Sequence, residues 1–277
     1  MNKVLVGVLV GGIVAVNGAA GLGGVPLNSI EGVGGIAFNP LAYPAGNGAP
    51  EAKDEDATTK EHLFGLPQIG AWYVHLGDSS IDWTALGAAE TLFQRVEVSY
   101  GHEIIGTEGA DTIYKDNVGA KVLVIKEGKV VPAVSVGGIG KHTSLDVPEG
   151  VDESGIDLYL VGTKLIKELP KPVLLSGGLI STTGRTLGVL GFDEDRAQAL
   201  FGNVDVLPLE YIAVGFEYRQ GAHFDDFKNA DYWNAHLAWF ANKNLTLVGA
   251  YVNAGDEKSS SQIGLGDGFV LSAQYAF

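Results

Sequence analysis

The nine residues FVLSAQYAF, Phe269–Phe277, contain the pattern from which we predict the fold. Apolar and aromatic residues occupy every odd position from Phe269 to Phe277, whereas Ser272 and Gln274 stand at even positions. Successive side chains of a β-strand point to opposite faces. The stretch is therefore predicted to be a strand with one face suited to an apolar environment and a terminal aromatic at the edge of that face.

The same two-residue period recurs along most of the chain. In Tyr211–Gln220, Ile212, Val214, Phe216 and Tyr218 share one face and Glu217 and Arg219 the other. Runs of about ten alternating residues bounded by turn signals are typical of strands. We predict twelve of them: Ile69–Leu76, Ile81–Thr91, Arg95–Glu103, Val118–Lys126, Val131–Lys141, Ile156–Ile166, Val173–Thr182, Ala197–Leu207, Tyr211–Gln220, Tyr232–Ala241, Leu245–Asn253 and Phe269–Phe277.

The connections between these runs alternate in length. Short ones such as Leu92–Gln94 and Asn242–Asn244 are interleaved with long polar ones, namely Ile104–Asn117, His142–Gly155, Thr183–Arg196, Gly221–Asp231 and Ala254–Gly268. Outer-membrane barrels have short periplasmic turns and longer extracellular loops, whereas a secreted β-sandwich gives no reason for this asymmetry. Aromatic residues near strand ends, Trp83 and Tyr251 among them, also favour an outer-membrane barrel.

We therefore predict an all-β protein, a transmembrane antiparallel up-and-down β-barrel of about twelve strands in the outer membrane. An open strand edge is not tolerated in lipid, so the last strand must pair with the first, near Ile69–Leu76. A strand that ends in this way resembles the assembly signal of bacterial outer-membrane proteins. Its outward residues Leu271, Ala273, Tyr275 and Phe277 would then engage the barrel-assembly machinery.

The residues before the barrel fall into two parts. Residues 1–20 combine a short positive start with an uncharged run, Val4–Val16, and small residues before Gly21, the layout of a signal peptide. Residues 21–67 form an N-terminal segment, and residues 68–277 the barrel. Within that segment Glu51–Glu61 looks solvated, but Ile30–Gly46 is too apolar for a disordered linker, which favours a lumen plug or an inward-folded strand.

Several of these stretches carry a resemblance. The segment IEGVGGIAFNPLAYPAG (Ile30–Gly46), the strand RVEVSYGHE (Arg95–Glu103) and the tail WFANKNLTLVGAYVNAGD (Trp239–Asp256) are similar to a family of proteobacterial outer-membrane proteins, domain of unknown function 3034. The resemblance implies an outer-membrane β-barrel. It implies no reaction, substrate or catalytic residues, and the acidic insert Asn47–Lys60 departs from the family pattern.

Composition excludes several kinds of site. The chain has 277 residues and no cysteine, so it forms no disulfide, thiolate metal site or c-type haem attachment. Its formal net charge of −15 argues against nucleic acid as a partner. We predict no cofactor and no metal site, because the histidines lack ligand spacing and the acidic loop residues lack the spacing of a calcium loop.

One short motif is compatible with a hydrolase. His142 and Ser144 stand two apart on an extended segment, but a nucleophile also needs an orienting third group and an oxyanion hole. We therefore predict no enzymatic activity and name no catalytic residue.

Charged residues on the polar faces are the functional candidates. If the alternation holds, the following point into the lumen: Arg95, Glu97, Lys121, Lys141, Asp157, Asp205, Glu217, Arg219 and His236. In a pore they would tune selectivity, whereas in a filled interior they would pair with one another. We predict a narrow porin-like channel for small solutes. The alternative is a non-conducting structural or interaction barrel, embedded in outer-membrane lipid, whose acidic loops meet an envelope or extracellular partner.

Overall fold

The computed structural model describes residues 26–45, 64–65, 67–255 and 262–277. Residues 1–20, the predicted signal peptide, and the Glu51–Glu61 stretch lie outside the described residues. Within the described part, no helix is long and apolar enough to span a membrane.

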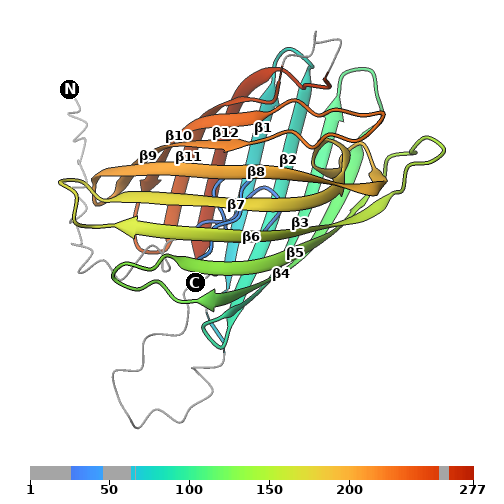
Figure 1. The fold of residues 1–277 in the computed structure, drawn as a ribbon. Coiled ribbons are helices and arrows are strands. Elements are labelled where there is room, and N and C mark those ends of the chain that lie inside the picture. Colours follow the sequence, from blue (N-terminus) through green and yellow to red (C-terminus); the bar gives the residue numbers. More distant parts are fainter. Residues whose placement is uncertain (1–25, 46–63, 66, 256–261) are drawn as a thin grey trace, which may run out of the picture.

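Twelve antiparallel strands close into a single barrel, each paired with its neighbours in the sequence (Figure 1). All twelve predicted strands are confirmed, with changes at their ends. The strands are β1 (Gln68–Leu76), β2 (Ile81–Leu92), β3 (Val96–Thr107), β4 (Ile113–Ile125), β5 (Ala133–Thr143), β6 (Ser154–Ile166), β7 (Val173–Gly184), β8 (Phe192–Leu209), β9 (Ile212–Arg219), β10 (Tyr232–Phe240), β11 (Leu245–Asn253) and β12 (Asp267–Ala276).

The barrel closes where the sequence predicts. β12 pairs with β1 in an antiparallel register that runs from Gln68 opposite Ala276 to Leu76 opposite Gly268. The other edge of β12 pairs with β11. No strand edge is therefore left open, as a hydrocarbon environment requires.

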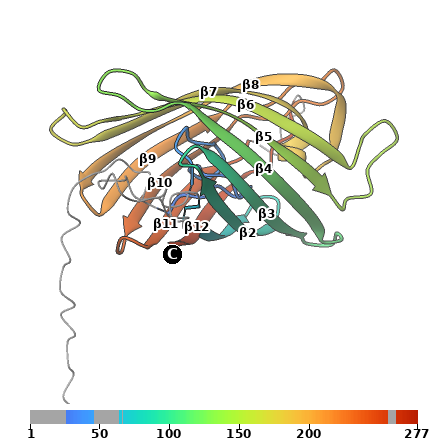
Figure 2. The ribbon, with the colours of Figure 1, turned by 90° about the horizontal axis from the view of Figure 1, so that it is seen from below.

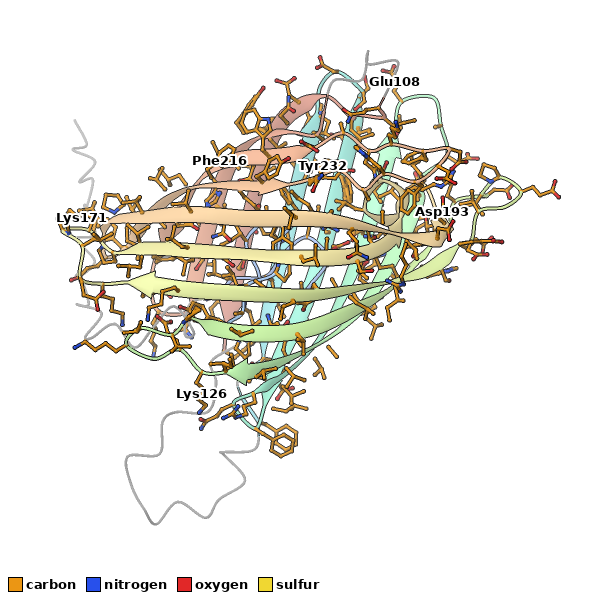
Figure 3. The ribbon with its side chains drawn as sticks, in the orientation of Figure 1. Glu108, Lys126, Lys171, Asp193, Phe216 and Tyr232 are labelled. Carbon is orange, nitrogen blue, oxygen red and sulfur yellow. The ribbon has the colours of Figure 1, made fainter. Side chains whose placement is uncertain are left out.

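The outer surface is an apolar belt. Large side chains on alternate positions of every wall strand face outward, including Val118, 65% exposed, and Leu200, 59% exposed. Phe216, labelled in Figure 3, belongs to this outer set. A continuous apolar band around a closed barrel is the lipid-facing surface of an outer-membrane protein.

Tyrosine–aspartate pairs occur on the outer surface beyond this belt. The phenols of Tyr73, Tyr100 and Tyr218 donate hydrogen bonds of 2.5–2.6 Å to Asp82, Asp116 and Asp231, each on or beside a neighbouring strand. Such amphipathic rings suit the membrane–water interface. Trp83 does not join them, contrary to the prediction, because it is 4% exposed and packs inside the barrel.

The two ends of the barrel differ. Lys126 and Lys171 lie at the end that carries the short turns, and Glu108 and Asp193 at the end that carries the longer loops (Figure 3). By the usual asymmetry the first end is periplasmic and the second extracellular. The loops at the extracellular end are shorter than predicted, since β3 and β4 extend until only residues 108–112 join them, and β8 begins at Phe192.

Candidate functional site

A segment of the chain from before β1 fills the barrel. Residues 27–45, which we call the plug, appear in blue inside the strands in Figures 1 and 2. Nearly all of these residues are buried. The Asn28 amide donates to Gln274 on β12 (2.6 Å), and the Ala45 amide donates to Glu97 on β3 (2.5 Å), both in the periplasmic half of the barrel. The plug is thus a hairpin whose two described ends lie in the same half of the barrel.

The plug pairs mainly with itself rather than adding a strand to the wall. Its backbone forms a bridge between Asn28 and Gly34 and a second between Gly35 and Pro40. Wall side chains satisfy further plug groups: Thr163 accepts from the Ala42 amide (2.8 Å) and Ser135 donates to the Ala42 carbonyl (2.6 Å). Contacts of this kind can be replaced by water, unlike a strand ladder buried in lipid.

Three glycines allow the closest approach between plug and wall. Gly32 has a φ of 86°, and a Cβ on it would lie 2.4 Å from the carbonyl oxygen of Tyr100. A Cβ on Gly101 would lie 2.6 Å from the Glu31 carbonyl oxygen, and one on Gly87 would lie 2.9 Å from Gly32 Cα. Side chains are thus excluded from both sides of this contact.

The tip of the plug carries a buried ion network. Lys115 Nζ lies 3.1 Å from Glu31 Oε1 and 2.7 Å from Glu103 Oε1. Lys141 Nζ bonds to the same Glu31 oxygen and lies 2.7 Å from Asp157 Oδ2. The Arg219 guanidinium lies 3.5 Å from Asp157 Oδ2. We call these six residues the Glu31 network.

The charge of Glu31 is strongly stabilised. Burial alone raises the pKa of its carboxyl group, but the nearby Lys141, Lys115 and Arg219 outweigh burial and lower the pKa to about 2. A carboxylate with this environment remains ionised at neutral pH.

Two further carboxylates hold the backbone of the plug. Glu97 accepts from the Gly34 amide (2.9 Å) and pairs with Lys121 (2.7 Å), whose ammonium also donates to the Gly34 carbonyl (3.0 Å). Glu217 accepts from three successive plug amides, of which the shortest bond is to Asn39 (2.8 Å). Each carboxylate therefore binds the plug through its backbone amides.

A polar chain extends from Glu217 along the wall. Asn234 donates to Glu217 (2.5 Å), and its carbonyl oxygen lies 2.7 Å from Nδ1 of His236. Nε2 of His236 lies 2.6 Å from Asp205. Both ring nitrogens of His236 therefore lie within hydrogen-bond distance of side-chain oxygens.

The structure places eight of the nine candidate residues inside the barrel, and the alternation explains why. They are Glu97, Lys121, Lys141, Asp157, Asp205, Glu217, Arg219 and His236. Arg95 is the correction: it is exposed in the turn before β3, where its guanidinium donates to the carbonyl of Leu123 (3.1 Å). Side chains in a turn do not alternate between two faces, so the two-residue period does not predict the orientation of Arg95.

Three residues of the Glu31 network are not among the predicted lumen residues, namely Glu31, Glu103 and Lys115. Glu103 shares the parity of Glu97 on β3, and Lys115 shares that of Lys121 on β4, so the alternation signal was present. Lys115 is not predicted to face the lumen because the predicted strand begins only at Val118, whereas β4 begins at Ile113. Glu31 carries a different signal, since it is the only Asp, Glu, Lys or Arg among residues 26–45.

An inward-folded loop covers the plug from the extracellular side. Residues 185–191, between β7 and β8, place Leu187 and Val189 against the apolar cluster of Trp72 and Trp83. The Lys141 ammonium donates to the Leu187 carbonyl (3.4 Å), so one lysine contacts both the loop and the plug. Outside, Arg185 pairs with Asp193 (2.6 Å) and Asp226 (2.9 Å).

Little empty space remains among the described residues. A cavity of about 60 Å³ lies between the plug and the inward loop, lined by Phe38, Trp83, Leu187, Tyr232 and their neighbours. A second, of about 30 Å³, lies beside His236 and Gln274. Both cavities are lined in part by plug residues.

His142 and Ser144 do not form a hydrogen-bonded pair. Nδ1 of His142 lies 2.9 Å from the Ser154 hydroxyl, and the Ser144 hydroxyl accepts from the Tyr114 amide (2.8 Å). Among the residues whose placement is described, no group of three His, Asp or Glu side chains could hold a metal ion.

Comparison with known proteins identifies the family. The model of the family described as "Protein of unknown function (DUF3034)" matches residues 23–273. The chain belongs to this family. A search of curated proteins gave no match.

Two solved structures similar to this chain are porins. The KdgM porin has a TM-score of 0.52 at 14% identity, covering 76% of this chain and 99% of that one. The NanC porin has a TM-score of 0.55 at 11% identity, covering 76% of this chain and 98% of that one. At these identities the likeness concerns the fold, and this member of the family is a porin-like outer-membrane barrel.

Proposed function

We propose that the protein is a narrow channel for small solutes, closed by the plug and opened when the plug withdraws toward the periplasm. The supporting observation is the way in which the wall holds the plug. Glu97, Glu217, Lys115 and Lys141 bind it through side chains, and water can take the place of these contacts. Withdrawal would leave a polar, hydrated passage.

The route of withdrawal is simple, because the plug is a hairpin. Asn28 and Ala45 contact wall residues in the periplasmic half, while Glu31 contacts Lys115 and Lys141 near the extracellular ends of β4 and β5. No part of the described plug passes through the barrel to the other side. It can leave without unthreading, and the wall strands need not separate.

The fold fits this proposal. One structure of the similar KdgM porin is in complex with disordered oligogalacturonate, so a barrel of this type holds a solute there. We carry over to this chain only the idea of solute passage. The proposal assigns no catalytic residue.

Conductance across planar bilayers tests the proposal. Glu31→Gln removes the plug's charge and leaves buried lysines with less compensation, a change that costs about 3–5 kcal/mol when a buried pair is broken. We expect frequent step openings from this variant and rare ones from the wild type. Glu108→Gln, the same substitution at an exposed extracellular residue, is the matched control and should behave as the wild type.

One observation favours the alternative of a non-conducting barrel, namely the near-complete filling of the interior. That alternative predicts no conductance steps from Glu31→Gln, even when the variant migrates as a folded barrel on unheated gels. It also assigns the acidic residues near Asp195 and Asp225 to contact with an envelope partner. Openings from the folded variant would contradict it.

A further inference from the structure

The plug presents one charged group to the wall, and the wall is built to receive it. Among residues 26–45, Glu31 is the only Asp, Glu, Lys or Arg. Its carboxylate contacts Lys115 and Lys141, both nearly fully buried. Lys121, by contrast, donates to a backbone carbonyl of the plug. Lys115 and Lys141 therefore differ from Lys121 in that their plug partner is a carboxylate.

The wall around Glu31 has one positive charge in excess. Its cations are Lys115, Lys141 and Arg219, and its anions are Glu103 and Asp157. Three positive charges against two negative ones leave a net charge of +1, which Glu31 neutralises. A buried excess charge is costly, so the site favours an anion over a neutral group.

Both lysines of the site also have partners on the wall. Lys115 is held by Glu103 at 2.7 Å, and Lys141 by Asp157 at 2.7 Å, so each lysine has a wall partner that fixes its position. The wall beside it is glycine at positions 87 and 101, where a Cβ would meet the plug backbone. Withdrawal of the plug therefore leaves a preorganised cationic site with free space next to it.

We infer that Lys115, Lys141 and Arg219 form a carboxylate-binding site in the lumen, occupied by Glu31 in the closed state and by the carboxylate of an acidic solute in the open state. This inference rests on the proposed plug movement. It names the solutes as small carboxylates, and it makes the solute a competitor of the plug. Since a ligand stabilises the state that binds it, the solute promotes opening.

The acidic extracellular loops do not oppose this assignment. Glu194, Asp195, Asp225 and Asp226 lie at the mouth of the barrel, and salt screens charges beyond about 8 Å at physiological ionic strength. Those residues slow the entry of anions at low salt. Affinity at the site depends on the lysines in direct contact.

A single cysteine reports plug withdrawal. The chain has no cysteine, and the buried Ser29 hydroxyl has no hydrogen-bond partner among the described residues, so Ser29→Cys is a small change. The full-length protein in detergent is treated with a charged thiol reagent, with galacturonate or the neutral sugar galactose present. We expect galacturonate to raise the labelling rate by about tenfold, which corresponds to about 1.4 kcal/mol, and galactose to leave it unchanged.

Two lysine variants distinguish loss of the carboxylate site from a general weakening of plug binding. Lys141→Gln should abolish the effect of galacturonate. Lys121→Gln is the matched control, because Lys121 is also buried and also bonds to the plug but contacts no plug carboxylate. It should raise the basal labelling rate and keep the response to galacturonate. Equal responses to the two sugars in the Ser29→Cys protein, or a response that survives Lys141→Gln, would overturn the inference.

Direct binding provides a readout that does not depend on conductance. In Glu31→Gln the internal competitor is gone, so galacturonate should bind about tenfold more tightly than to the wild type, whereas galactose should bind to neither. Equal affinity of both proteins for galacturonate would overturn the site. Carboxylate binding without conductance would refute the proposed channel alone, and conductance without carboxylate preference would refute the site alone.

Discussion

At the residue scale, glycine sets how closely plug and wall approach each other. Gly101 lies on β3 opposite the Glu31 backbone, with no room for a methyl group. Gly249 on β11 has nothing within 4 Å of an added Cβ. The same substitution at these two positions therefore separates displacement of the plug from any general effect of alanine on a strand.

We expect Gly101→Ala to displace the plug and Gly249→Ala to leave it in place. The added Cβ would meet the Glu31 carbonyl oxygen at 2.6 Å, which backbone can relieve only by moving. The measurement is the labelling rate of Cys in a Ser29→Cys background, which should rise in the first variant only. An unchanged rate in Gly101→Ala would contradict the close contact between Gly101 and the Glu31 carbonyl oxygen.

The contribution of Glu31 to plug docking should depend on pH. Its pKa in the docked state is about 2, below the value of about 4.3 for an exposed glutamate. Docking therefore gains from this group above about pH 4.3, and the gain is lost as the pH falls toward 2. The ratio of the labelling rates of Glu31→Gln and the wild type, both carrying Ser29→Cys, should fall toward one over this window. The ratio is compared at each pH because the thiolate fraction lowers both rates alike. A ratio that stays constant down to pH 2 would contradict the prediction.

Residue parity explains which parts of the site the sequence could predict. Eight wall residues, Glu97 and Glu217 among them, could be assigned to the interior because their strands keep a period of two. Arg95 could not, since it lies in a turn. Glu31 could not be paired with Lys115 and Lys141 from sequence, because the plug backbone is irregular and its path depends on distant partners.

At the element scale, each strand is specified by the apolar residues that alternate along its outward face. β8 alternates buried and exposed positions through its centre, with Leu200 among the most exposed. The sequence predicted every strand from this alternation, but it placed several ends too early. β3 continues past Glu103 to Thr107 because its ladder with β2 goes on to Ile81, beyond the apolar run.

A charge on this outer face should be costly. Leu200→Arg places a guanidinium near the middle of the lipid-facing belt and should reduce the free energy of unfolding by about 2–4 kcal/mol. Glu210→Arg, in an exposed periplasmic turn, is the control and should change it little. Urea unfolding of the barrel in lipid vesicles measures both. A similar loss in the two variants would contradict the placement of the belt.

At the scale of the whole molecule, wall and plug are complementary in charge as well as shape. The wall contributes Lys115, Lys141 and Arg219 in excess over Glu103 and Asp157, and the plug contributes Glu31. Barrel closure could be predicted from the apolar alternation and the intolerance of lipid for open edges. The filling of the barrel could be predicted only as burial of the apolar stretch Ile30–Gly46, because burial does not specify a docking geometry.

Recognition of β12 by the assembly machinery stays a prediction. Leu271, Ala273, Tyr275 and Phe277 all face outward, and the rings of Tyr275 and Phe277 lie 5.2 Å apart. This row is therefore accessible from the membrane side.

The bond between Asn28 and Gln274 also bears on how the molecule folds. It joins residues 246 positions apart, and Gln274 lies opposite Gly70 in the pair of strands that closes the barrel. Contacts between such distant parts of a chain form slowly, since a large loop must close before they contribute. The start of the plug can therefore make this bond only once β12, the last strand of the barrel in chain order, is in place.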